Sequence, residues 1–146
     1  MKKSFFKICL ILLIFLQSCG YEPIYSSKNF LFKINKIDYE GNSINNQIAG
    51  SLRSLSNENA KNSLNLVLNS KKEKKIVSKN KSGDAEIFSL EISTNILINN
   101  KQKTFTSLQN YNNNENKFEL NQYEIEIEKQ IINQLIDDII IYLAQF

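Results

Sequence analysis

The amino-acid sequence predicts an α+β fold, a two-layer sandwich of about four mainly antiparallel strands with two helices packed on one face. Apolar and polar residues alternate over 64–69 and 88–98, the period of strands that bury one face. Over 44–55 and 131–146 the apolar residues recur every three or four positions, the period of amphipathic helices. The predicted order is strand, helix, three strands, helix, within a single domain.

The first predicted element is a strand over residues 30–39. Its apolar residues change parity between Ile34 and Ile37, which predicts a bulge near Asn35–Lys36. Gly41–Asn42 ends this strand. Asn42 or Ser43 is then suited to cap a helix. The apolar face of that helix consists of Ile44, Ile48, Leu52 and Leu55.

Three further strands are expected after this helix. Leu64, Leu66 and Leu68 mark the first of them, and a polar, lysine-rich segment over 71–86 follows. The next strand has the most regular alternation in the chain, interrupted by Thr94. Asn99-Asn100-Lys101 predicts a hairpin turn into a last strand around 103–111, and 112–117 reads as a loop. The alternating residues of the second strand are Phe88, Leu90, Ile92, Ile96 and Ile98.

The C-terminal helix is predicted to be long and to form core with the sheet face of residues 88–98. Residues 123–128 alternate with period two and locally resemble a strand. No helix breaker separates them from 131–146, so we expect the helix to extend back through them. The apolar arc consists of Ile131, Ile132, Leu135, Ile136, Ile139, Ile140, Tyr142, Leu143 and Phe146, and Ile141 is the apolar exception on the opposite arc.

The N-terminus has the pattern of a cleaved lipoprotein signal peptide. Lysines at positions 2, 3 and 7 precede an apolar run from Ile8 to Leu16, which is shorter than the roughly 20 residues that a membrane-spanning helix needs. Leu16-Gln17-Ser18-Cys19 resembles the bacterial lipobox. We therefore expect 1–18 to be the signal peptide, Cys19 the lipidated residue, 19–29 a tether and 30–146 the periplasmic domain. Gly20 after the cysteine favours the outer membrane.

Charge and composition argue against several functions. The chain has a net charge of +3, and cleavage would remove three lysines, so the mature chain is neutral and a nucleic-acid role loses its main support. The sequence has no histidine, Cys9 would leave with the signal peptide and lipidation would use Cys19, so neither an imidazole nor a free thiol remains for catalysis. We expect no enzyme activity and no cofactor.

Two sets of charged residues, one basic and one acidic, can each be interpreted either as a functional site or as solvated surface. The lysine-rich segment contains the side chains able to meet phosphates of an anionic glycolipid, although a solvated hairpin tip is the simpler interpretation. Asp137 and Asp138 are neighbours on a helix and diverge by about 100°, so they are interpreted as part of a solvated face. The candidate lipopolysaccharide contacts are Lys71, Lys72, Lys74, Lys75, Lys79 and Lys81.

Three segments resemble the lipopolysaccharide-assembly lipoproteins of the LptE family. The start of the expected mature chain, Cys19 to Tyr25, reads CGYEPIY and is similar to the opening of the alphaproteobacterial type. Residues 132–146, INQLIDDIIIYLAQF, resemble the closing helix of that family, and Ser107 to Asn112 match a Ser-x-x-x-Tyr-Asn feature before it.

The resemblance implies a lipid-anchored, periplasm-facing protein of the outer membrane. In the family this domain sits as a plug in the barrel protein LptD, supports its assembly, and contacts lipopolysaccharide on the way to the cell surface. Of the residues here, Cys19 matches a functional position of the family, the lipidated one. An alternative is another outer-membrane lipoprotein, such as the auxiliary lipoprotein of a lipid-transport ABC system.

Overall fold

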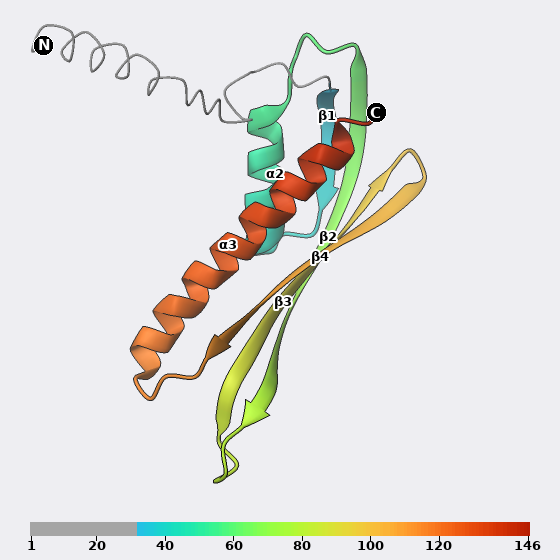
Figure 1. The fold of residues 1–146 in the computed structure, drawn as a ribbon. Helices are drawn as coiled ribbons and strands as arrows, with labels where there is room; N and C mark the ends of the chain where they lie inside the picture. Colours follow the sequence, from blue (N-terminus) through green and yellow to red (C-terminus); the bar gives the residue numbers. More distant parts are fainter. Residues whose placement is uncertain (1–31) are drawn as a thin grey trace, which may run out of the picture.

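The structure, a computed structural model, describes residues 32–146, which form one four-stranded sheet with two helices on one face (Figure 1). The predicted fold class and element order are confirmed. The segments expected to be the signal peptide and the tether, and with them Cys19, lie outside the described residues. The elements are β1 (Phe32–Tyr39), α2 (Ser43–Leu55), β2 (Asn62–Lys79), β3 (Ala85–Ile98), β4 (Lys101–Asn112) and α3 (Lys117–Leu143).

The strands lie in the sheet in the same order as in the chain, β1-β2-β3-β4. β2, β3 and β4 pair antiparallel through short turns, whereas β1 pairs parallel with β2. A parallel pair needs a crossover connection, and α2 provides it. The Asn42 side chain caps α2 by accepting a hydrogen bond from the Asn45 amide at 2.7 Å.

The bulge expected in β1 is present. Ile34 pairs with Leu64 and Lys36 with Asn65, so Asn35 has no counterpart in β2. This extra residue returns Ile37 to the same face as Ile34, and both side chains are buried. The inserted Asn35 therefore explains why the apolar residues of this strand change from even to odd positions and still face the core.

The β3–β4 turn is a two-residue loop. Asn99 and Asn100 have φ angles of 49° and 64°, the left-handed values that a type I′ turn requires at both positions. Asparagine tolerates this region better than most side chains. Because the loop is only two residues long, β4 begins at Lys101, two residues earlier than predicted.

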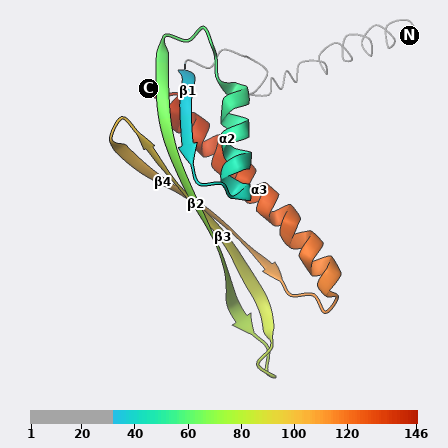
Figure 2. The ribbon, with the colours of Figure 1, turned by 180° about the vertical axis from the view of Figure 1, so that it is seen from behind.

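The core lies between the sheet and the helices. α3 packs on β3 and β4, α2 packs on β1 and β2, and the two helices contact each other (Figure 2). The predicted apolar face of 131–146 is buried or partly buried, and Ile141 is 65% exposed. Thr94, the polar interruption in β3, is also buried and shares a 2.8 Å hydrogen bond with the Ser70 hydroxyl. The buried hydroxyl groups of Thr94 and Ser70 thus satisfy each other in the core.

α3 extends back to Lys117, so residues 123–128 are helical, as expected. The Asn116 side chain caps the helix by accepting from the amides of Phe118 and Glu119. Ile125 is exposed and Ile127 is fully buried. Their alternation with glutamates reflects helix positions on different faces and does not indicate a strand.

β2 differs from the prediction, because it continues for about ten residues beyond Leu68 and ends at Lys79. The interpretation of the whole 71–86 segment as a hairpin tip is therefore wrong, and the turn itself is confined to 80–84. The lysine-rich half of β2 lacks the alternation of apolar and polar residues that is typical of a strand. It nevertheless pairs with β3 from Lys71↔Ser93 through Ile76↔Phe88. Its strand character comes from this pairing and not from a buried apolar face.

Candidate binding surface

The long β2–β3 hairpin projects past the N-terminal end of α3, and both views show its tip apart from the helices (Figures 1 and 2). We call residues 75–87 the distal hairpin. Asn80 shapes its turn, because the Asn80 Oδ1 atom accepts hydrogen bonds from the amides of Ser82 and Asp84, each at 2.9 Å. Gly83 has a φ of 90°, a value that favours glycine.

The structure divides the six candidate lysines among three places. Successive β-strand residues point to opposite faces of the sheet. Lys72 and Lys74 therefore lie on the face that α3 covers, and Lys71 and Lys75 lie on the face without helices, which we call the open face. Lys79 and Lys81 lie at the tip. A single six-lysine site does not form.

Lys72 and Lys74 join β2 to α3 through ion pairs. The Lys72 ammonium donates to the Glu128 carboxylate at 2.9 Å, and Lys74 forms a close ion pair with Glu124. The Lys74 nitrogen also lies 4.2 Å from the centroid of the Phe88 ring, within cation–π range. These two charges are occupied in holding the helix on the sheet and are not free for a ligand.

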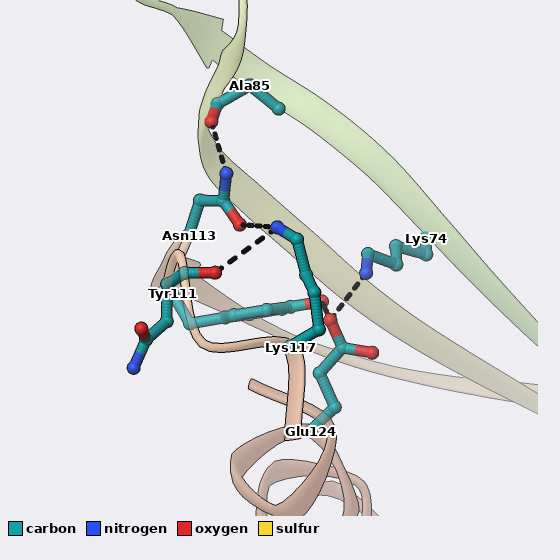
Figure 3. A network of polar contacts seen from close by, with 7 residues as sticks. Lys74, Ala85, Tyr111, Asn113, Lys117 and Glu124 are labelled. Carbon is teal, nitrogen blue, oxygen red and sulfur yellow. Dashed lines mark hydrogen bonds and ion pairs between the residues drawn. The ribbon is translucent and has the colours of Figure 1, made fainter. Parts of the chain in front are cut away.

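Glu124 is the centre of a polar network (Figure 3). Its Oε1 atom accepts a 2.8 Å hydrogen bond from the Tyr111 hydroxyl as well as the Lys74 contact. Burial raises the pKa of Glu124, but the hydrogen bonds from Lys74 and Tyr111 and the nearby lysine charges outweigh it, so the net direction is downward. The pKa of Tyr111 is raised, mainly because the hydroxyl is partly buried and further because it donates a hydrogen bond to Glu124. The network therefore holds an ionised carboxylate beside a neutral phenol.

The same figure shows how the β4–α3 loop is held. The Lys117 ammonium donates to the Asn113 side-chain oxygen and to the Asn114 carbonyl, at 3.3 and 3.2 Å. The Asn113 amide in turn donates to the Ala85 carbonyl at 2.8 Å. These bonds attach the loop to the first residue of β3.

On the open face, Glu73 lies between Lys71 and Lys75. It pairs with both, and Lys75 also reaches Glu91 on β3 at 3.7 Å. Hydrogen bonds from Lys71 and Lys75 lower the pKa of Glu73 to about 2. The carboxylate therefore offsets much of the positive charge of this part of the segment.

Lys79 and Lys81 are the candidates that remain available. Both are exposed, and neither takes part in an ion pair within residues 32–146. In the same hairpin, Ile76 and Val77 are 51% and 54% exposed. The distal hairpin therefore carries two exposed cations and two exposed apolar side chains. Sequence reasoning missed the apolar pair, although Ile76-Val77 is the one apolar dipeptide within the lysine run.

The remaining sequence-based candidates give no convergent site. Asp137 and Asp138 are exposed on the outer face of α3, as interpreted from the sequence, and partial burial together with Asp138 raises the pKa of Asp137. Over the described part of the chain there is no cluster of three or more potential metal ligands. None of the helices between residues 32 and 146 combines the length and hydropathy needed to cross a membrane.

No protein-family model matches the sequence, and no curated protein matches it. Solved structures of bacterial lipoproteins do match the fold. A minor lipoprotein from Acinetobacter baumannii has a TM-score of 0.58 at 12% identity, over 80% of this chain and 94% of that one. Rare lipoprotein B from Shewanella oneidensis has a TM-score of 0.54 at 16% identity, over 76% and 95%. An uncharacterized lipoprotein B from Nitrosomonas europaea has the same TM-score at 15% identity, over 75% and 80%.

The chain has the fold of these bacterial lipoproteins. The likeness covers 80–95% of each of the three neighbours, so the shared fold extends over most of their length. At 12–16% identity the likeness concerns the fold alone, and it transfers no residue role.

Proposed function

We propose that this protein is a lipoprotein of the bacterial outer membrane, anchored through Cys19, that binds the lipopolysaccharide-assembly barrel protein LptD and contacts lipopolysaccharide. The observation that carries the proposal is the fold shared with bacterial lipoproteins. The lipobox ending in Cys19 and the segments that resemble the LptE family support it independently. The role proposed is one of binding and assembly, without a catalytic step.

The lipopolysaccharide contact is assigned to the distal hairpin. The lipid part of lipopolysaccharide carries phosphates next to acyl chains, so a complementary surface needs cations beside apolar groups. Lys79 and Lys81 supply point charges for phosphates, and Ile76 and Val77 supply exposed apolar surface. The other four candidate lysines have carboxylate partners within the domain.

Co-purification tests the partner. The full-length protein, isolated from detergent-solubilised outer membranes, is expected to bring down LptD in a stable complex, and its depletion should lower both assembled LptD and surface lipopolysaccharide. Recovery of components of a lipid-transport ABC system in place of LptD would favour the auxiliary-lipoprotein alternative. Normal LptD assembly after depletion would contradict the proposal.

A matched pair of double variants tests the lipopolysaccharide contact. Lys79→Gln with Lys81→Gln should weaken binding of the full-length protein to lipopolysaccharide vesicles. Lys101→Gln with Lys103→Gln removes the same charge from the opposite end of β3, at the β3–β4 turn, and should leave binding nearly unchanged. Equal effects of the two pairs would show that only net charge matters and would overturn the assignment to the distal hairpin.

A further inference from the structure

Two neighbouring hollows flank the β4–α3 loop. The first lies between the loop and the first turns of α3 and has a volume of about 610 Å³. The second lies between the loop and the distal hairpin and has a volume of about 410 Å³. Both volumes are typical of small-molecule sites. The two hollows share Asn112, Asn113 and Glu115, and neither is lined by the lysines or the exposed apolar residues assigned above.

The wall between the hollows is held in place from both sides. In Figure 3 the Asn113 side chain lies between Lys117 and Ala85 and contacts both. The Asn113 backbone N–H also donates to the Glu86 carbonyl on β3 at 2.8 Å. Because the loop is fixed in this way before a ligand arrives, binding in the hollows has a smaller ordering cost.

The first hollow is lined by polar groups that the fold does not use. The Asn112 amide, the Glu115 carboxylate and the Tyr123 hydroxyl have no hydrogen-bond partner within residues 32–146, and all three residues are exposed. An amide both donates and accepts, a phenol does the same, and a carboxylate accepts. The hollow therefore offers donors and acceptors together.

Tyr123 adds an apolar ring to these polar groups. Its side chain is 47% exposed, and its ring packs edge-to-face on Tyr111 with 6.2 Å between the centroids. This contact fixes the ring while part of it stays accessible at the hollow.

The charges around the hollows disfavour an anionic ligand. Glu115 lines both of them, Glu119 lines the first and Glu86 lines the second. The Lys117 ammonium already donates to the side chain and main chain of the loop. A phosphate or carboxylate ligand would therefore meet like charges here, in contrast to the exposed lysines of the distal hairpin.

We propose that the first hollow is a saccharide-binding site. Sugar hydroxyl groups donate and accept hydrogen bonds, which fits Asn112 and Glu115, and the C–H face of a sugar ring fits the exposed ring of Tyr123. The second hollow extends the site towards the distal hairpin and gives room for an oligosaccharide. The inference stands on the hollows alone and does not depend on the proposed function.

Two envelope polymers present such sugars to a lipoprotein that faces the periplasm, lipopolysaccharide and peptidoglycan. Saturation-transfer NMR of the full-length protein in detergent micelles, with one probe for each, separates them. The first probe is the core oligosaccharide of lipopolysaccharide, freed of acyl chains and phosphates, and the second is a tetramer of N-acetylglucosamine. Binding of at least one probe is expected, and the one that binds identifies the polymer. Binding of neither would overturn the proposal.

A matched pair of asparagine variants assigns the binding to the hollow. Asn112→Ala removes an amide without breaking a hydrogen bond inside the domain, and it should weaken binding of the probe about tenfold in calorimetric titrations. Asn110→Ala removes the same exposed side chain two residues earlier on β4, outside both hollows, and should leave binding unchanged. Equal losses in the two variants would contradict the site.

Variants of Tyr123 test the role of the ring. Tyr123→Leu should weaken binding strongly, whereas Tyr123→Phe keeps the ring and should retain most of it. Circular dichroism of both variants checks that loss of the contact with Tyr111 has not unfolded the domain. If the leucine variant were folded and bound the probe like the parent, the proposed packing on the ring would be wrong.

Glu115→Gln distinguishes a saccharide site from an ionic one, because it removes the charge and keeps an acceptor. Binding of the probe should persist in this variant and should not require added Ca²⁺. Loss of binding, or a requirement for Ca²⁺, would overturn the proposal. Lys79→Gln with Lys81→Gln should leave saccharide binding unchanged, so a failure of this site and a failure of the distal-hairpin assignment are seen separately.

Discussion

At the scale of single residues, Glu124 connects three elements that are far apart in the sequence. From α3 it accepts hydrogen bonds from Lys74 on β2 and from Tyr111 on β4. The N-terminal half of α3 offers fewer apolar contacts to the sheet than its C-terminal half, where most of the buried isoleucines lie. Polar contacts therefore carry a larger share of the attachment at this end.

We expect Glu124→Gln to destabilise the fold by about 1 kcal/mol near pH 7, because it removes a charge-assisted contact that is partly exposed to water. The pKa of Glu124 is lowered on folding, so its stabilising contribution is present above the unfolded value of 4.5 and is lost as the pH falls through the folded value. Denaturant titrations of parent and variant should differ most near neutral pH and converge in acid. A difference in stability that did not shrink as the pH was lowered into the acid range would contradict this role.

At the scale of elements, the fold depends on α3 covering the sheet. Leu135 and Ile139 have no exposed surface, whereas Ile141, two residues after Ile139 and on the opposite side of the helix, is largely exposed. This contrast shows that helix position and not residue type decides what each isoleucine or leucine contributes.

Leu135→Ala and Ile139→Ala should each lower the free energy of unfolding by about 2–5 kcal/mol, since each leaves a cavity between the layers. Ile141→Ala is the control and should change stability by less than about 0.5 kcal/mol. Thermal unfolding followed by circular dichroism measures all three. Equal melting of the three variants would rule out the two-layer packing.

The β3–β4 turn allows a second test at this scale. Asn99→Val places a β-branched side chain at a φ of 49° and should cost about 1–2 kcal/mol. Asn100→Gly relieves the left-handed position at φ 64° and should be neutral or stabilising. If the valine variant were as stable as the parent, the turn would not be type I′.

Much of this architecture is predictable from local pattern. The alternation of β3, the helical arc of 131–146 and the parity change at Asn35 each follow from burial on one face. The second half of β2 was not predictable in the same way, because Lys72 and Lys74 pair with glutamates of α3, and Lys71 and Lys75 pair with Glu73. Such partners lie up to 56 residues away, so no local period reveals the strand.

The candidate site was predictable only in part. The lysine run indicated a basic segment, but its composition could not show that four of the six charges have carboxylate partners. Exposure of Ile76 and Val77 is a property of the projecting hairpin and becomes visible only when its length is known.

At the scale of the whole molecule, the proposed function depends on attachment to a membrane. Mass spectrometry of the mature protein should find a diacylglyceryl group on an N-terminal Cys19. Cys19→Ser should block lipidation and processing, and the protein should then no longer fractionate as a mature outer-membrane lipoprotein. An unmodified Cys19, or cleavage at another position, would contradict the anchor while leaving the domain fold unaffected.

The coincidence of strand order with chain order has a consequence for biosynthesis. As the chain emerges from its N-terminus, each new strand finds its neighbour already present, and after the crossover through α2 only short turns have to close before the sheet can grow. The cover for the core face of β3 and β4 comes last, in the final 27-residue helix. A product terminated within the Asn112–Asn116 loop would thus retain a complete sheet with a bare aliphatic surface, and we expect such a product to be degraded or to aggregate in the cell.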